Sequence, residues 1–151
     1  MQVLRKSRKE PKMGDIFVLQ VRKGEFILGR VVTTNARLGG FDNVILIYIY
    51  QTVTKKKSHI PPLKSDKLLI PPLGTNQQPW LRGYFQTVAH EPLREKDVLR
   101  THCFRDALTG KYLDEQGREL EEKVEPCGEY GVASYRMIDY EVSKALGLPI
   151  E

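Results

Sequence analysis

Apolar residues in the first third of the chain occur in short runs that polar, glycine-containing breaks separate, as is typical of β-strands. Two runs rich in β-branched and aromatic residues, 15–21 and 25–32, flank the tripeptide at 22–24. Two such runs joined by a short glycine-containing break predict a β-hairpin. Gly29 interrupts the second run, and a glycine inside a strand often marks a bulge or a close backbone approach. We therefore expect a hairpin that curls.

The strongest strand signal is the run VILIYIYQTV at residues 44–53, which follows a segment rich in Gly, Asn and Asp (34–43) that predicts a loop. Alternation places apolar side chains on both faces of this strand. A strand that is apolar on both faces belongs at the centre of a sheet or has a helix packed behind it. One face carries Val44, Leu46, Tyr48 and Tyr50, and the other carries Ile45, Ile47 and Ile49.

Two proline pairs follow this run, in the segments HIPPLKSD (59–66) and LIPPLGTN (69–76). Consecutive prolines fix φ and hold the preceding residue in an extended conformation. We expect both segments to be extended and to cross the surface.

The stretch PWLRGYF contains the only tryptophan of the chain and begins a run with strand alternation at residues 80–89. In a strand, Trp80, Arg82 and Tyr84 share one face, and Phe85 points the other way, toward the core. Trp, Tyr and Arg are the side chains most enriched at binding hot spots. The shared face is therefore either a second packing layer or an exposed surface for a partner, and both interpretations stay open.

The last third of the chain predicts two short β features and one helix. A short strand is expected at residues 102–104, and residues 112–120 predict a hairpin in which Gly117 takes the positive φ of the turn. Ser134 can cap a helix that ends before Gly147. An apolar stripe along this helix must be buried against other elements. The stripe comprises Ile138, Val142, Ala145 and Leu146.

These elements predict an α+β fold that is mainly β. We expect a curled antiparallel sheet, or a partly open small barrel, with one C-terminal helix packed on it. The 151 residues suffice for one domain with its own core. Residues 1–12 are strongly basic and predict a flexible leader, which leaves residues 13–151 as a single domain.

The net charge of +5 is distributed unevenly along the chain. Residues 1–60 carry a net charge of +8, residues 61–110 carry +2, and residues 111–151 carry −5. The positive charge is concentrated in residues 5–12 and 55–57, which favours a solvated tail and a solvated loop over a nucleic-acid surface. The acidic last third would repel a phosphate backbone if it faced the same side.

The sequence contains no residue pattern that is typical of a catalytic or metal site. The histidines, His59, His90 and His102, have no partner at metal-ligand spacing. The chain also lacks a GxSxG motif and a phosphate-binding loop with its lysine. We therefore expect a protein that is not an enzyme, with no catalytic residue, no metal and no cofactor.

Cysteine content and hydropathy bear on the compartment. Cys103 and Cys127 are too few for the disulfide scaffold of a secreted protein, so we expect reduced thiols, although a bridge between them stays open. The longest apolar run, residues 44–50, is far shorter than the ~20 residues of a membrane span. The basic N-terminus has no apolar segment of a secretory signal behind it. We expect a cytoplasmic protein without a membrane partner.

Several stretches of the chain resemble the immunity protein 26 family, some members of which also carry the label phosphotriesterase HocA-like. They are MGDIFVLQVRKGEFILGRVV, LLIPPLGTNQQPWLRGYFQTV, CFRD and YLDEQGREL, and the similarity runs from about Gly14 to Gly147. The residues that match the family pattern are Gly14, Asp15, Gly29, Arg30, Pro79, Trp80, Gly83, Tyr84 and Phe85. We interpret most of them as structural.

The resemblance implies an immunity-type domain of a bacterial polymorphic toxin system, which binds a cognate toxin and neutralises it without chemistry of its own. The second label would require a binuclear metal centre, for which the sequence has no cluster of histidines and carboxylates. Many toxins of these systems are nucleases with basic sites, which an acidic surface complements. The candidate partner-binding residues are Glu115, Glu121 and Glu122 of the acidic segment 114–129, together with Trp80, Arg82 and Tyr84.

Two other function classes stay open. The basic first half and the curled opening hairpin also fit a nucleic-acid-binding small barrel related to toxin–antitoxin endoribonucleases. A metal-dependent hydrolase would agree with the second family label.

Overall fold

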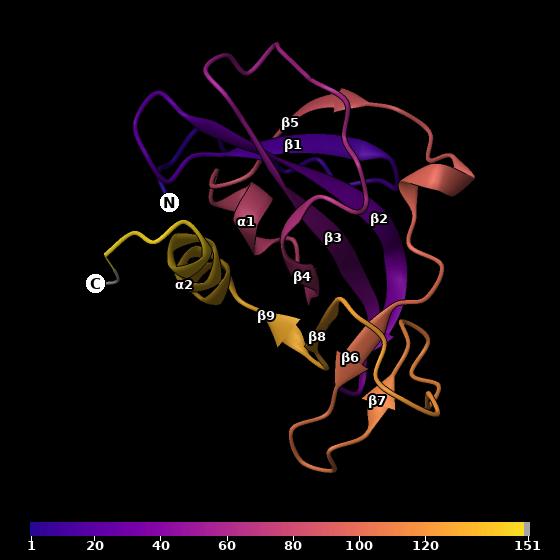
Figure 1. Ribbon diagram of the computed structural model, residues 1–151. Coiled ribbons are helices and arrows are strands. Elements are labelled where there is room, and N and C mark those ends of the chain that lie inside the picture. The colour runs from indigo at the N-terminus through magenta and orange to yellow at the C-terminus, as the bar shows by residue number, and fades with distance from the viewer. Residues whose placement is uncertain (150–151) are drawn as a thin grey trace.

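The computed structural model describes residues 1–149 and contains a strongly bent sheet, a helix against one face of it and a small second sheet at one end (Figure 1). The large sheet has six strands in the order β5-β1-β2-β3-β4-β9 and is not closed. Its neighbours pair antiparallel, except that β4 and β9 are parallel. The predicted fold class is confirmed. The strands are β1 Asp15–Leu19, β2 Phe26–Leu38, β3 Phe41–Thr54, β4 Leu68–Thr75, β5 Gln86–His90 and β9 Val132–Ala133.

The predicted opening hairpin is confirmed as the pair β1 and β2. Phe17 lies opposite Gly29 in the register of this pair. A Cβ added at Gly29 would lie 2.3 Å from Cζ of Phe17, so the glycine makes room for the aromatic ring. The close approach that Gly29 predicted therefore exists, although a side chain fills the space in place of a second backbone.

β3 occupies the middle of the sheet, between β2 and β4, and both of its faces are buried. Ile47 belongs to a core cluster that includes Trp80 and the C-terminal helix. Tyr48, the next residue, belongs to a second cluster on the opposite face, which loops and Phe104 of the small sheet cover. The prediction of a central strand with two apolar faces is confirmed.

The loop predicted at residues 34–43 is wrong. β2 continues to Leu38 and β3 begins at Phe41, so that only two residues connect them. These are Gly39 and Gly40, with φ of +61° and +83°, a backbone conformation that glycine adopts without strain. Ala36 and Leu38 are fully buried while the residues between and before them are exposed. This alternation is a strand signal that the polar composition of the segment concealed.

The two proline segments have different structures. Residues 59–66 form an irregular loop, whereas the second proline pair, Pro71 and Pro72, lies inside β4. The second segment is therefore extended as expected, but the expectation that it crosses the surface is wrong, because it is a strand of the sheet. β4 pairs with β9 only at residues 74–75, so the prolines lie where its outer edge needs no N–H donor.

The strand predicted to begin at Trp80 is wrong as well. Residues Gln78–Leu81 form a single helical turn, α1, and the strand β5 begins only at Gln86. Pro79 suits the first turn of a helix, and Gly83 adopts a φ of +83° that reverses the chain after it. Trp80 consequently points into the core and is 1% exposed.

Trp80 is part of an aromatic cluster that joins α1 to the sheet. Its ring meets the Phe17 ring edge-on at a centroid distance of 5.3 Å and the Phe85 ring edge-on at 5.1 Å. The Phe17 and Phe85 rings stack at 4.3 Å. Phe85 thus faces the core as predicted, and Trp80 faces it too.

A three-stranded sheet, β7-β6-β8, lies at one end of the molecule (Figure 1). The short strand and the hairpin predicted here are both confirmed, and Gly117 has a φ of +77° in the hairpin turn. The strands of this sheet are β6 Cys103–Arg105, β7 Tyr112–Leu113 and β8 Cys127–Glu129. A single turn of 3₁₀-helix, Glu95–Asp97, lies in the segment between β5 and β6.

The two cysteines face each other across the parallel pair β6 and β8. Cys103 and Cys127 are register partners, and their Sγ atoms are 2.9 Å apart. Both are free thiols in the structure. Burial, followed by the contact with Cys103, raises the pKa of the Cys127 thiol to about 12.

The C-terminal helix α2, Tyr135–Ala145, packs on β4 and β9 as predicted. The Ser134 side chain caps it by accepting a hydrogen bond from the Met137 N–H at 3.2 Å. Ile138 and Val142 are fully buried in the core cluster around Trp80. Ala145 is exposed, so the buried stripe is narrower than the predicted one.

The basic N-terminal segment has backbone partners in the domain. The Leu4 N–H donates to the Gly83 carbonyl at 2.7 Å, and the Ser7 N–H donates to the Trp80 carbonyl at 3.0 Å. The segment therefore lies beside α1 and its following turn. The flexibility of residues 1–12 stays a prediction.

We expect the substitution Gly29→Ala to destabilise the protein by about 1–3 kcal/mol, the usual cost of overpacking a core. The added methyl group would collide with the Phe17 ring, which Trp80 and Phe85 hold in place. Urea unfolding followed by tryptophan fluorescence measures the change in the free energy of unfolding.

Gly131→Ala is the matched control, because no atom lies within 4 Å of a Cβ built there. Equal stability of the two variants would contradict the role assigned to Gly29.

Candidate functional site

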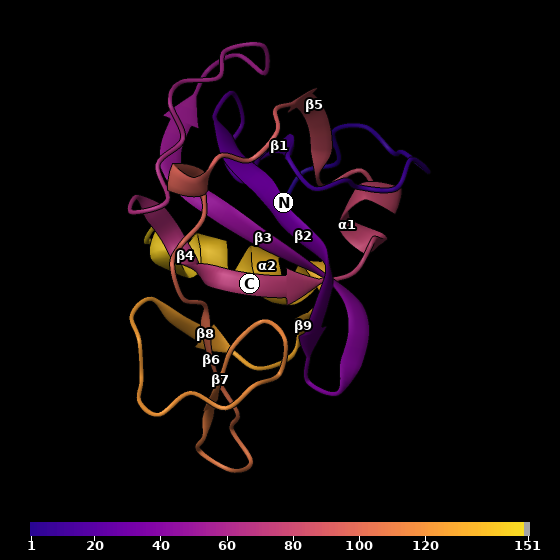
Figure 2. The ribbon, with the colours of Figure 1, turned by 90° about the vertical axis from the view of Figure 1, so that its right-hand side faces the viewer.

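The acidic segment 114–129 forms the hairpin turn and the loop of the small sheet. Both ribbon views place this sheet at the far end of the molecule from β5 and the N-terminal segment (Figure 2). The basic leader therefore lies away from the acidic segment 114–129, although it does contact the rest of the acidic last third, since the Met1 ammonium lies 2.7 Å from Oδ2 of Asp139 on α2. The separation gives the molecule two ends of opposite charge.

Two of the seven carboxylates in this segment form ion pairs with lysine side chains. Glu119 lies 3.6 Å from the Lys111 ammonium, and Glu125 lies 3.0 Å from the Lys123 ammonium. The second pair lowers the pKa of Glu125 and raises the pKa of Lys123.

Glu121 and Glu122 remain exposed and have no ion pair among residues 1–149. They are the two candidate residues whose charge is available to a partner. Unpaired charges in water act mainly by steering an oppositely charged partner during approach.

Glu115, the third acidic candidate, is held by a buried histidine. Oε2 of Glu115 lies 3.1 Å from Nδ1 of His102, which is 5% exposed. Nε2 of the same ring lies 2.6 Å from the hydroxyl of Tyr48 on β3. The hydrogen bond from His102 lowers the pKa of Glu115 despite its partial burial.

The proton positions in this chain of hydrogen bonds follow from the donors present. The Leu99 N–H donates to the Tyr48 hydroxyl at 3.0 Å. Burial raises the pKa of Tyr48 to about 12, so the hydroxyl keeps its proton. In the tautomer of His102 whose Nδ1–H faces Glu115, Nε2 accepts a hydrogen bond from this hydroxyl. The Nδ1–H of His102 then donates to the Glu115 carboxylate, and each group has its partner. The network fastens the acidic hairpin to the central strand. Sequence reasoning missed it because only the tertiary fold brings Tyr48 and His102 together.

The three candidates from the tryptophan stretch lie in different environments. Trp80 is buried in the core, so a partner can meet it only through the residues that cover it. The guanidinium of exposed Arg82 lies 5.0 Å from the ring centroid of Tyr135, and the Tyr84 ring stacks on the same ring at 5.1 Å. Arg82 and Tyr84 therefore share a surface with the start of α2.

Two large side chains on other sides of α2 are also exposed, and one of them, Met137, lines a hollow with residues of β4 and β8. Met137 is 51% exposed and Tyr140 is 42% exposed. Sequence reasoning passed over both residues because it followed only the buried stripe of the helix. A large apolar or aromatic residue on the polar face of a predicted helix is the signal that would have found them.

Three residues of the family pattern converge on one short segment. Gly14 has a φ of +95°, and a Cβ there would lie 2.6 Å from the Glu91 carbonyl oxygen. Oδ1 of buried Asp15 lies 2.8 Å from Nδ1 of His90, and Nη2 of Arg30 donates to the Glu91 carbonyl at 2.8 Å. The three residues hold the chain where it leaves β5. Of the other pattern residues, Gly29, Pro79, Gly83 and Phe85 shape the core around Phe17 and Trp80.

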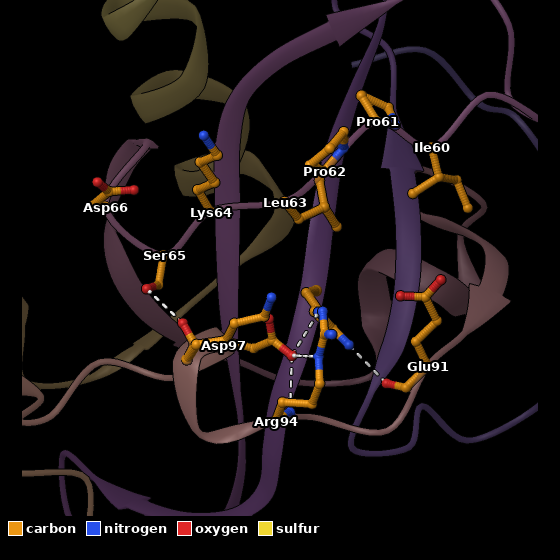
Figure 3. A pocket seen from close by; sticks show the side chains of 12 residues that line it. Ile60, Pro61, Pro62, Leu63, Lys64, Ser65, Asp66, Glu91, Arg94 and Asp97 are labelled. Carbon is orange, nitrogen blue, oxygen red and sulfur yellow. Dashed lines mark hydrogen bonds and ion pairs between the residues drawn. The ribbon is translucent and has the colours of Figure 1, made fainter.

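A cavity of about 680 Å³, which we call the Arg30 cavity, opens beside this segment (Figure 3). The proline loop 60–66 lines one side of the cavity, and residues 91–97 line the other. Arg30 of β2 also lines it and is only 3% exposed. Sequence reasoning assigned Arg30 to the family pattern but gave no sign of the cavity, because three distant segments build it.

The described part of the chain contains no group of three or more His, Cys, Asp or Glu side chains that could hold a metal ion. Among the same residues, no helix is long and apolar enough to cross a membrane.

Comparison with known proteins gives one family match. The model of the family described as Immunity protein 26 matches residues 12–113. No curated protein and no solved structure matches the chain significantly. The matched range includes β1 to β7 and the Arg30 cavity, whereas the acidic loop after β7 and α2 lie outside it.

We expect Glu115→Gln to reduce the loss of stability at acid pH. The pKa of Glu115 in the folded protein lies below its ordinary value of 4.5. The hydrogen bond to His102 therefore contributes stability above pH 4.5, which is lost as the pH falls through the folded-state pKa. Glutamine keeps an acceptor for His102 but has no proton to gain. Between pH 7 and pH 3, the free energy of unfolding measured with urea should fall by about 1 kcal/mol less in this variant than in the wild type.

Glu119→Gln serves as the control, because its carboxylate is 59% exposed beside Lys111. If the free energy of unfolding of Glu115→Gln falls as much at pH 3 as that of the wild type, the prediction is contradicted.

Proposed function

Because the chain belongs to the immunity protein 26 family, we propose that it binds a cognate bacterial toxin domain in the cytoplasm and neutralises it without catalysis. Neutralisation by binding requires a surface that covers or distorts the toxin site. The acidic end of the molecule is the surface that best fits this role. It is built on the small sheet and is fastened to the core through His102.

The observation that supports this surface is the state of Glu121 and Glu122. Both are exposed, and both lack an ion pair among the residues that the structure describes. They lie at the end of the molecule that the basic leader does not reach (Figure 2). A nuclease toxin with a basic site would meet this end first, since complementary potentials orient the approach.

The surface formed by Arg82, Tyr84 and Tyr135 provides a second kind of contact. Arginine over an aromatic ring gives a rigid, partly apolar contact area of the type found at hot spots. We assign it to affinity, whereas the acidic end sets the rate of association.

The first test is capture of the tagged protein from its own cells, followed by mass spectrometry of the eluate. A C-terminal toxin domain in stoichiometric amount is the expected result. Elution of the protein without any toxin domain under conditions of toxin expression would argue against the proposal.

With the toxin in hand, we expect the double variant Glu121→Lys/Glu122→Lys to associate about tenfold more slowly at low salt. The dependence of the association rate on salt should also flatten, because the charges that salt screens are gone. Stopped-flow association at two ionic strengths measures both effects. The dissociation rate should change little.

Glu10→Lys/Glu95→Lys is the matched control, because it makes the same change in net charge at exposed residues outside the acidic segment. If both double variants slow association equally, net charge alone is responsible and the assigned surface is wrong.

Nucleic-acid binding is a second candidate, which one observation favours. Nζ of Lys57, in the basic loop, donates to Oε1 of Gln86 on β5 at 2.9 Å. A hollow beside Gln86 is lined by Arg5 and Lys6 of the basic leader. The two basic segments that are distant in sequence thus meet at this edge of the sheet.

Binding of a labelled single-stranded RNA 20-mer tests this candidate. Phosphate contacts predict a dissociation constant that rises steeply between 50 and 200 mM salt, and weaker binding by Lys6→Gln. No binding at 50 mM salt would exclude it.

A further inference from the structure

Arg30 lines the cavity beside the hydroxyl of Tyr50, with which it interacts, and one of its donor atoms, Nε, has no acceptor among residues 1–149. Its Nη2 donates to the carbonyls of Glu91 at 2.8 Å and Pro92 at 3.5 Å. Nη1 lies 3.7 Å from Oδ2 of Asp97, which is beyond hydrogen-bond distance. Nε is buried and has no hydrogen-bond partner among residues 1–149. A guanidinium has five N–H donors, and a buried one that lacks acceptors is costly.

The charges next to Arg30 leave a surplus of one positive charge. Asp97 is 5% exposed and lies between two guanidinium groups, those of Arg30 and Arg94. Burial raises the pKa of Asp97, but the Arg94 N–H bond and the two positive charges outweigh it and lower the pKa. Asp97 is therefore ionised, and two cations surround one anion. One additional monovalent anion would balance this inner group.

The walls of the cavity limit the kind of anion. Ile60, Pro61, Pro62 and Leu63 form an apolar wall on one side (Figure 3). Four exposed charged residues also line the cavity: Lys64, Lys96, Asp66 and Glu91. The two lysines and the two carboxylates cancel, so the surplus of one positive charge remains and is balanced by a monoanion rather than a dianion. The apolar wall favours a ligand with an apolar body.

We propose that the Arg30 cavity binds a monocarboxylate with a short apolar chain, whose carboxylate accepts hydrogen bonds from Arg30 and Arg94. Guanidinium groups match the planar geometry of carboxylates, which explains two arginines at this position. The carboxylate belongs either to a small free acid or to a glutamate side chain of another protein chain. The proposal does not depend on toxin binding, because the cavity and the acidic end share no residue.

The arginine Nε–H signals in a two-dimensional ¹H–¹⁵N spectrum of the full chain test the proposal directly. Sodium butyrate is titrated at constant ionic strength, with butyramide as the neutral isostere and inorganic phosphate as the other anion. We expect a saturable shift of the Arg30 and Arg94 signals with butyrate, none with butyramide, and weaker binding of phosphate.

Arg94→Gln should weaken butyrate binding about tenfold, the effect of one lost charge-assisted hydrogen bond. Arg100→Gln is the matched control, because Arg100 is exposed and does not line the cavity. A dispersed amide spectrum for Arg94→Gln shows that it has folded. Equal affinity of the two variants would overturn the proposal.

A second probe, the capped tripeptide Ala-Glu-Ala, tells the two sources of the carboxylate apart. The capped tripeptide Ala-Gln-Ala, which lacks the carboxylate, is its neutral control. Saturable binding of butyrate supports a free acid, and binding of the glutamate peptide alone supports the side chain of another chain. The carboxylate assignment would be overturned if neither butyrate nor the glutamate peptide binds. An equal response to butyramide, or tighter binding of phosphate, would overturn it as well.

Discussion

Both faces of β3 must be kept from water, and the arrangement of the other elements follows from this constraint. On one face, the Trp80 turn and α2 cover Ile45, Ile47 and Ile49. On the other face, no α-helix of residues 1–149 packs, and Tyr48 and Tyr50 are covered by loops and by Phe104 of the small sheet. A helix satisfies its own backbone hydrogen bonds, whereas a loop that covers a sheet leaves backbone N–H and C=O groups that need other partners. Polar anchors are needed there.

Those anchors are buried polar side chains beneath the loops. Arg30 holds the segment after β5 through the carbonyls of Glu91 and Pro92. His102 holds the acidic hairpin through Glu115, and reaches the central strand through Tyr48. Buried polar groups with complete partners fix one arrangement, whereas those with missing partners mark places where a ligand can contribute. His102 is of the first kind and Arg30 of the second.

The same anchors connect the fold with its proposed activities. The family match covers the sheet and the Arg30 cavity, while the acidic loop and α2 follow it in sequence. A constant frame can thus present different surfaces at its acidic end, where Glu121 and Glu122 remain unpaired in the part of the chain described. Separation of the basic leader from this end keeps the two charged surfaces from neutralising each other (Figure 2).

The sequence by itself determined the elements whose signals are local: the opening hairpin, the two-faced β3, the Gly117 turn and the capped α2. Their period, caps and turn residues act within a few positions along the chain. It failed where distant contacts decide. Trp80 entered the core because Pro79 and Gly83 bend the chain over Phe17, although the alternation around it was that of a strand. Tertiary structure alone decided which carboxylates are free. Glu115 is not, because it is hydrogen-bonded to His102, which lies at a different strand in the sequence. It likewise decided that Arg30 lines a cavity, because the loops around it come from separate parts of the chain and meet only when both faces of β3 are covered.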